Sequence, residues 1–106
     1  MSGHHRNEER SLALHQAVAE KLLDEPAVLA RARHKVESWH QDGSVHPHYA
    51  AAWRRLLALT PEEIARRLVD RNQEMTDLRQ SSPFADALSP RERWAILRRL
   101  PIVETR

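Results

Sequence analysis

The chain has only two glycines in 106 residues, and this scarcity narrows the folds open to it. Tight hairpins between strands depend on glycine where the backbone becomes left-handed. Alanine, leucine, arginine and glutamate, which favour helices, are abundant instead. The composition therefore predicts an all-α fold, and the length suffices for one domain with one modest hydrophobic core.

Helix-start signals recur along the chain. Thr60-Pro61-Glu62-Glu63 and Ser89-Pro90-Arg91-Glu92 each place a capping hydroxyl before a first-turn proline, with glutamate at the third helical position. Pro26 is a further first-turn proline, and Gly43 stands where a left-handed cap would end a helix. With apolar residues at helical spacing, these signals predict a compact bundle of five to six short helices, over residues 11–25, 26–41, 47–59, 61–78 with a break near Asn72, and 90–100.

The same pattern predicts how the chain is organised. Residues 1–10 contain no apolar side chain after Met1, which favours a flexible N-terminal tail. Leu14, Val18 and Leu22 lie four residues apart on one helix face, which Leu12, Ala19 and Leu23 widen. The expected parts are the tail at 1–10, a helical body at 11–80, a C-terminal helical interaction segment at 81–101 and a tail at 102–106.

The composition also indicates where in the cell the protein acts and which partners its charge would favour. The chain has no cysteine, so neither disulfides nor thiolate chemistry is expected. No apolar run approaches the length of a membrane span, and the first eleven residues are polar, so we expect a cytoplasmic protein without a membrane partner. The net charge is +2: the first fifty residues carry a net −1 and the remainder +3, and every basic residue of the remainder is arginine. Arginine suits interfaces, although coding bias explains such an excess equally well.

Catalytic and metal-binding signatures are missing from the sequence. It has no nucleophile elbow, no glycine-rich phosphate loop and no carboxylate pair in apolar surroundings, so we expect neither an enzyme nor a cofactor. Four histidines and Asp42 are clustered in the first half, but His34 and His40 are six residues apart and lie on different helix faces. No metal site is predicted from this cluster, whose other two histidines are His46 and His48.

A helix-turn-helix motif for DNA binding is one interpretation of residues 61–80. Apolar residues match both helices of that motif, but Val69 stands at the corner where glycine is usual, followed by Asp70. Glu74 and Asp77 would repel phosphate. The candidate base-reading residues are Arg71, Asn72, Gln73 and Arg79. The alternative is an ordinary amphipathic helix with a break.

The stretch RQSSPFADALSPRERWAILRRLP, residues 79–101, gathers apolar and aromatic residues in a chain otherwise poor in aromatics. Aromatic and arginine side chains dominate interface hot spots. Trp94, Leu97 and Leu100 share one helix face, which we expect to point inward, whereas Ile96 lies away from it. The candidate partner-binding residues are Phe84, Leu88, Arg91, Arg93, Trp94, Ile96 and Leu97. The sequence leaves open whether Phe84 and Trp94 close the core or contact a partner.

Four strings in the chain also carry a family resemblance: RSLALH, HPHYAAAW, RQSSPF and LSPRERWAIL. They resemble short all-helical bacterial proteins encoded beside a toxin-like enzyme, often of nucleotidyltransferase type, which act as antitoxins or accessory subunits. The resemblance spans residues 10–98 and implies that the C-terminal helices mask the partner's active site. Phe84 and Trp94 would then be anchors, and Arg91 and Arg93 would pair with acidic groups; these roles rest on residue chemistry, not on a motif.

The function expected from the sequence is therefore that of an antitoxin or accessory protein that binds and occludes a toxin enzyme. A DNA-binding regulator using residues 61–80 is the alternative, and self-association stays open. The two functions are compatible, since antitoxins commonly repress their own operons.

Overall fold

The computed structural model describes residues 2–100, and within them all regular structure is helical. This confirms the predicted all-α fold. The six helices are α1 (Ser2–Asp24), α2 (Pro26–Asp42), α3 (Pro47–Leu57), α4 (Pro61–Leu68), α5 (Gln73–Arg79) and α6 (Pro90–Arg99). None of these helices is both long and apolar enough to cross a bilayer.

The first helix begins earlier than its apolar pattern indicates. We predicted a flexible tail before Ser11, but α1 already starts at Ser2. A helix is propagated by backbone hydrogen bonds, so polar residues can extend one whose apolar face begins only at Leu12. At the other end, Leu23 is 49% exposed and does not widen the buried face as expected.

The predicted helix boundaries at the caps are confirmed. Thr60 and Ser89 both form complete capping boxes, each with the glutamate three residues later. Gly43 ends α2 in the left-handed conformation, with φ of 71° and its N–H donated to the carbonyl of Trp39. The expected break near Asn72 separates α4 from α5, and the Asn72 side chain caps α5 by accepting from Met75 N.

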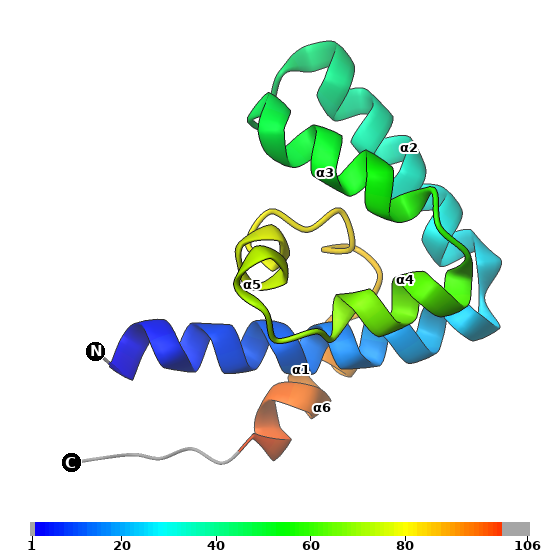
Figure 1. Cartoon of the computed structure of the whole chain (residues 1–106). Coiled ribbons are helices and arrows are strands. Elements are labelled where there is room, and N and C mark those ends of the chain that lie inside the picture. The colour runs from blue at the N-terminus through cyan, green and yellow to red at the C-terminus, as the bar shows by residue number, and fades with distance from the viewer. Residues whose placement is uncertain (1, 101–106) are drawn as a thin grey trace.

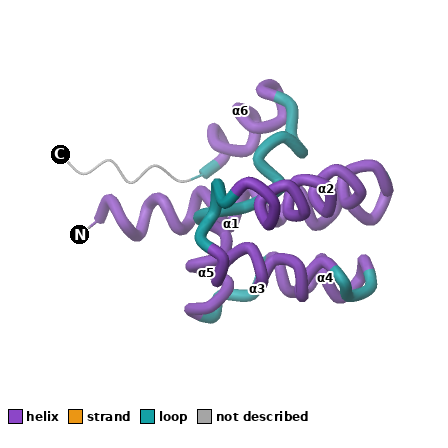
Figure 2. Tube along the Cα trace, turned by 90° about the horizontal axis from the view of Figure 1, so that it is seen from above, coloured by secondary structure: helices purple, strands orange, loops and turns teal. Residues whose placement is uncertain are grey.

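The main packing partner of α1 is α4, which is not the next helix along the chain. Figure 1 shows α4 lying along α1, while α2 and α3 form a hairpin that rises from the end of α1. The short α5 fills the space between these two pairs. In Figures 1 and 2, α6 lies on the opposite side of α1 from α4. The sequence-distant α1 and α4 thus form the centre of the bundle.

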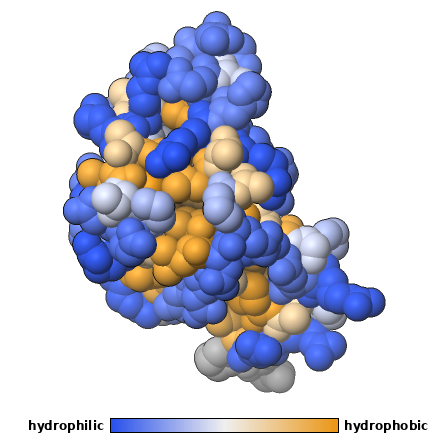
Figure 3. Space-filling view, turned by 90° about the vertical axis from the view of Figure 1, so that its right-hand side faces the viewer, coloured by the Kyte–Doolittle hydropathy of each residue, from blue (hydrophilic) through white to orange (hydrophobic). Residues whose placement is uncertain are grey.

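The hydrophobic core lies between α1, α2, α3, α4 and α5. Trp53, Ile64 and Leu68 are fully buried at its centre, with Met75 from α5 closing one side. Figure 3 shows apolar side chains gathered across the middle of one face of the molecule, bordered by hydrophilic ones. Among the described residues, the main core cluster draws on every helix except α6 and on the segment after α5: Val18, Leu22, Val28, Leu29, Ala32, Val36, Ala52, Trp53, Leu56, Leu57, Ile64, Leu68, Met75, Leu78, Phe84, Ala87 and Leu88.

Candidate functional site

The segment between α5 and α6 belongs to the core. Phe84 is 4% exposed, and its ring meets that of Trp53 edge-on, with centroids 6.1 Å apart. Leu88 is buried in the same cluster. Both were candidate partner contacts, but in this conformation nearly all of their surface is covered by the core. The part of the chain that stands apart from the body therefore begins at Ser89 and not at residue 81.

One lysine of α1 links α6 to the body through hydrogen bonds. Lys21 Nζ donates to the carbonyl oxygen of Ala87 at 2.8 Å and to Glu92 Oε1 at 2.9 Å. The hydrogen bond from Lys21 lowers the pKa of the Glu92 carboxyl, and so does the one from the Ser89 backbone. The same glutamate completes the Ser89 capping box, so a single carboxylate caps α6 and docks it.

The orientation of α6 differs from the one predicted. No residue of α6 is fully buried, and Trp94, which we expected to point inward, is 62% exposed. Ile96, expected to lie away from the inward face, packs against the core instead. Helical spacing tells which residues share a face, but the direction of that face is set by the Lys21–Glu92 contact and by the preceding segment.

The outward face of α6 combines an aromatic side chain with arginines. Arg91, Trp94 and Arg98 are three and four residues apart, so they share one face, and all three are exposed. Among the described residues none of these arginines forms an ion pair. Leu97 is half-buried beside them. Within residues 7–100, this face therefore presents an exposed indole flanked by two guanidinium groups that form no ion pair.

A buried histidine connects α1 to the segment before α6. His15 is 6% exposed; its Nδ1 lies 2.8 Å from the Ser11 carbonyl oxygen and its Nε2 lies 2.8 Å from Ser82 Oγ. Because a carbonyl can only accept, Nδ1 carries the proton and Ser82 Oγ donates to Nε2. Burial lowers the pKa of His15 to about 4, so the ring is neutral at neutral pH.

This pair shares part of the geometry of an activated nucleophile. A hydroxyl donates to an imidazole whose other nitrogen is fixed by a carbonyl. However, Ser82 Oγ also accepts from the nearby backbone N–H of Phe84 at 3.1 Å, a donor that could otherwise face an oxyanion. The geometry fits a structural contact that holds α1 against the segment after α5. Sequence reasoning missed it, although His15 lies three residues from both Leu12 and Val18 on the buried stripe.

The four candidate base-reading residues all form contacts with other residues of this chain. Arg79 is 6% exposed, and its Nη1 donates to the carbonyl oxygens of Leu68 at 3.0 Å and Asp70 at 2.7 Å. It caps the end of α4 and is not available to a base in this conformation. Asn72 caps α5, Gln73 Nε2 donates to Asp77, and Arg71 pairs with Glu9 at 3.3 Å on the surface.

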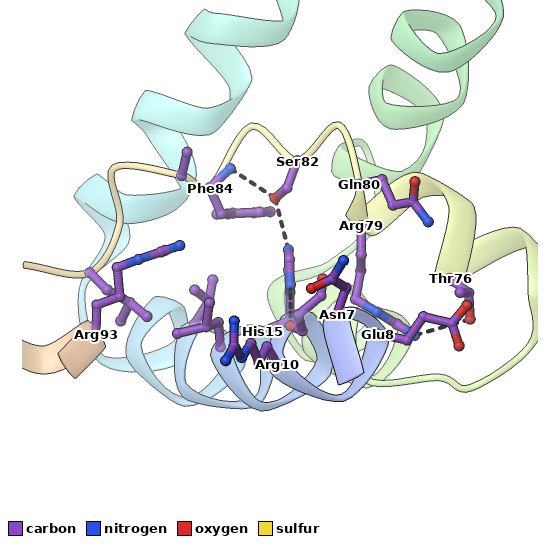
Figure 4. A pocket seen from close by; sticks show the side chains of 15 residues that line it. Asn7, Glu8, Arg10, His15, Thr76, Arg79, Gln80, Ser82, Phe84 and Arg93 are labelled. Carbon is purple, nitrogen blue, oxygen red and sulfur yellow. Dashed lines mark hydrogen bonds between the residues drawn. The ribbon is translucent and has the colours of Figure 1, made fainter. Parts of the chain in front are cut away.

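A pocket of about 560 Å³ lies where α1, α5 and α6 meet the segment at residues 80–89 (Figure 4). The His15–Ser82 pair forms part of its wall, and Phe84, Leu88 and Arg93, three candidate partner-binding residues, line it as well. Elsewhere, no group of three or more histidine or carboxylate side chains in the described part of the chain is placed to hold a metal ion. His46 instead caps α3 by accepting from His48 N.

Comparison of the chain with protein-family models, with curated proteins and with solved structures found no match.

Proposed function

We propose that this protein acts by binding a protein partner through the outward face of α6. The observation that carries the proposal is the exposure of Trp94 on a helix that buries no residue of its own. A large aromatic side chain left in water between two arginines has the composition of an interface hot spot. The body needs no further contact from this face, because its core is already closed by Phe84 and Leu88.

The charge of α6 indicates the chemistry of the partner. Arg91, Arg93, Arg98 and Arg99 stand on this helix against one acidic residue, Glu92, which Lys21 already engages. A surface of this kind is complementary to a patch rich in aspartate and glutamate, since guanidinium groups pair with carboxylates in bidentate fashion. We propose an acidic protein surface as the partner.

The finer proposal follows from the sequence resemblance: the partner is a toxin-like enzyme, and α6 covers its acidic active site in the cytoplasm. Acidic residues that hold a catalytic metal or a nucleotide would supply the required charge. Neutralisation would then be a matter of occlusion, with the toxin's chemistry left intact. The alternative of DNA binding through residues 61–80 is not favoured, because Arg79 and Asn72 are used to hold α4 and α5 together.

The test is capture from the native host with a tagged chain, followed by nuclease treatment and mass spectrometry. We expect one stoichiometric acidic protein, lost with Trp94→Ala or with Arg91→Ala combined with Arg98→Ala, and weakened by salt. Leu23→Ala, which removes an exposed apolar side chain outside α6, is the matched control and should retain the partner. Capture that is unaffected by the α6 variants, or recovery of nucleic acid without a protein, would refute the proposal.

If a partner is captured, its expression alone should arrest growth, and co-expression of the wild-type chain should restore it. The Trp94→Ala variant should fail to do so. A partner that is harmless when expressed alone would remove the antitoxin proposal while leaving protein binding in place.

A further inference from the structure

We propose that the pocket between α1, α5 and α6 is a binding site for a small organic anion with an apolar body. The inference does not depend on the partner proposal, because the pocket lies beside the outward face of α6 and uses none of its residues Arg91, Trp94 and Arg98. Its volume of about 560 Å³ is within the range of small-molecule sites.

Part of the pocket lining is apolar. Leu14 and Val18 from α1 line it together with Phe84 and Leu88 from the segment that precedes α6. These side chains can cover an alkyl or aryl group but offer no hydrogen bond to it. Such a lining favours the transfer of an apolar group out of water in proportion to the area covered.

The charged side chains of the pocket are mainly cationic. Arg10, Arg79 and Arg93 line it, against one carboxylate, that of Glu8. Glu8 lies close enough to Arg79 to favour its charged form, although desolvation dominates and lowers the pKa of Arg79. Arg10 and Arg93 are exposed and make no ion pair among the described residues. Figure 4 shows the Arg93 side chain extending from α6 toward the middle of the pocket.

The other wall is rigid and polar. His15 is neutral and fixed on both nitrogens, and Arg79 is fixed by the carbonyls of Leu68 and Asp70. Fixed side chains lower the entropy lost on binding, because they need no reordering. The two free guanidinium groups are then the ones left to pair with a carboxylate or phosphate, in the geometry that suits them best.

The experiment compares four probes by calorimetry with the full-length chain: octanoate, octanol, acetate and inorganic phosphate. Octanoate has both the anionic and the apolar part, octanol lacks the charge, and acetate and phosphate lack the apolar body. We expect saturable one-to-one binding of octanoate, with each of the other three at least about tenfold weaker.

Variants locate the binding. Arg93→Gln and Arg10→Gln should each weaken the affinity for octanoate by about tenfold, which is the loss expected for one charge-assisted hydrogen bond. Ala85→Phe should abolish binding by filling the pocket from an exposed position. Arg98→Gln on the outward face of α6 is the control and should bind as the wild type does. Circular dichroism of each variant checks that the fold is retained.

Three results would overturn the proposal. Octanol binding as tightly as octanoate would show an apolar cavity without anion recognition. Phosphate or acetate binding as tightly would show a site for simple anions. Octanoate binding that is unchanged in Ala85→Phe and in both arginine variants would place it elsewhere on the protein.

Discussion

Residues of the same chemical type have different roles in this chain. Phe84 and Trp94 are both aromatic and only ten positions apart, yet the first is 4% and the second 62% exposed. Their contributions to stability should therefore differ widely, since the energetic effect of a side chain depends on the area it removes from water.

Phe84→Ala should lower the free energy of unfolding by about 3–5 kcal/mol, because it empties the space packed against Trp53. This is a large part of the total stability of a small domain. Trp94→Ala should change it by about 0.5 kcal/mol or less. Urea denaturation followed by circular dichroism measures both. Equal losses for the two variants would contradict the assignment of Phe84 to the core.

His15 should make stability depend on pH. Its pKa is about 4 in the folded protein and about 6.5 when unfolded. Between these values the unfolded chain binds a proton that the folded chain does not, so stability is fully present above pH 6.5 and falls toward pH 4. The full loss amounts to about 3 kcal/mol.

Unfolding in urea at pH 7 and at pH 5 tests this dependence, with His15→Gln as the control. The glutamine cannot titrate, so the variant should be less stable at pH 7 but should lose much less stability on acidification. An equal drop in both proteins would assign the pH dependence to other groups.

At the level of elements, the break between α4 and α5 depends on a buried arginine. Arg79 donates to the carbonyls of Leu68 and Asp70 at the end of α4, and the bond to Leu68 is buried. The arrangement of these two helices is thus built from within and does not require a ligand.

Arg79→Ala should reduce the free energy of unfolding by about 1–3 kcal/mol, because it leaves the buried carbonyl of Leu68 without its hydrogen-bond donor. Arg71→Ala, which removes an exposed ion pair with Glu9, should change it by about 0–1 kcal/mol. Thermal and urea unfolding provide the comparison. If instead both variants keep full stability and lose DNA binding at low salt, the result would support the helix-turn-helix interpretation.

Helix α6 depends on its cap and on Lys21 more than on apolar packing. Ser89→Ala removes the capping hydroxyl, and Lys21→Met removes the contacts to Ala87 and Glu92 while keeping a long side chain. Each should speed amide hydrogen exchange within residues 90–99 by roughly fivefold to tenfold, as expected for a loss of about 1 kcal/mol. The core amides of α4 should exchange as in the wild type. Uniform acceleration across the chain would show that α6 is part of the global unfolding unit.

At the scale of the molecule, five helices and the segment at residues 80–88 share one core, and α6 stands on the far side of α1 from α4. This arrangement separates a self-sufficient body from an appended helix. It also fits both proposals, because a helix that is not needed for the core is free to present side chains to a partner and to border a pocket.

A chain that ends at Leu88 should keep the folded body. We expect one cooperative thermal transition, a loss of helical signal close to that of the ten residues of α6, and a decrease in stability of about 1–2 kcal/mol from the lost partial burial. Calorimetry and circular dichroism measure these quantities. A truncated chain without a cooperative transition would show that α6 is required for folding.

Local chemistry in the sequence was sufficient to predict the helices and most of their ends. The two capping boxes, the first-turn prolines and the cap at Gly43 each involve residues within four positions of one another, and a helix end is decided over that range. The apolar stripe over residues 11–25 identified Val18 and Leu22 as core residues of α1 for the same reason. Even the break at Asn72 was readable, because an asparagine side chain favours a cap over the interior of a helix.

The tertiary structure alone decided the site. Lys21 reaches Glu92 across 71 positions, and His15 reaches Ser82 across 67, so neither contact leaves a local pattern in the sequence. These contacts set which side of α6 faces the body, and they turn Trp94 outward and Ile96 inward. Arg79, which resembles a base-reading side chain in sequence, becomes a buried cap because of where α4 ends. Helical periodicity groups residues into faces, but only packing between distant segments chooses which face is covered.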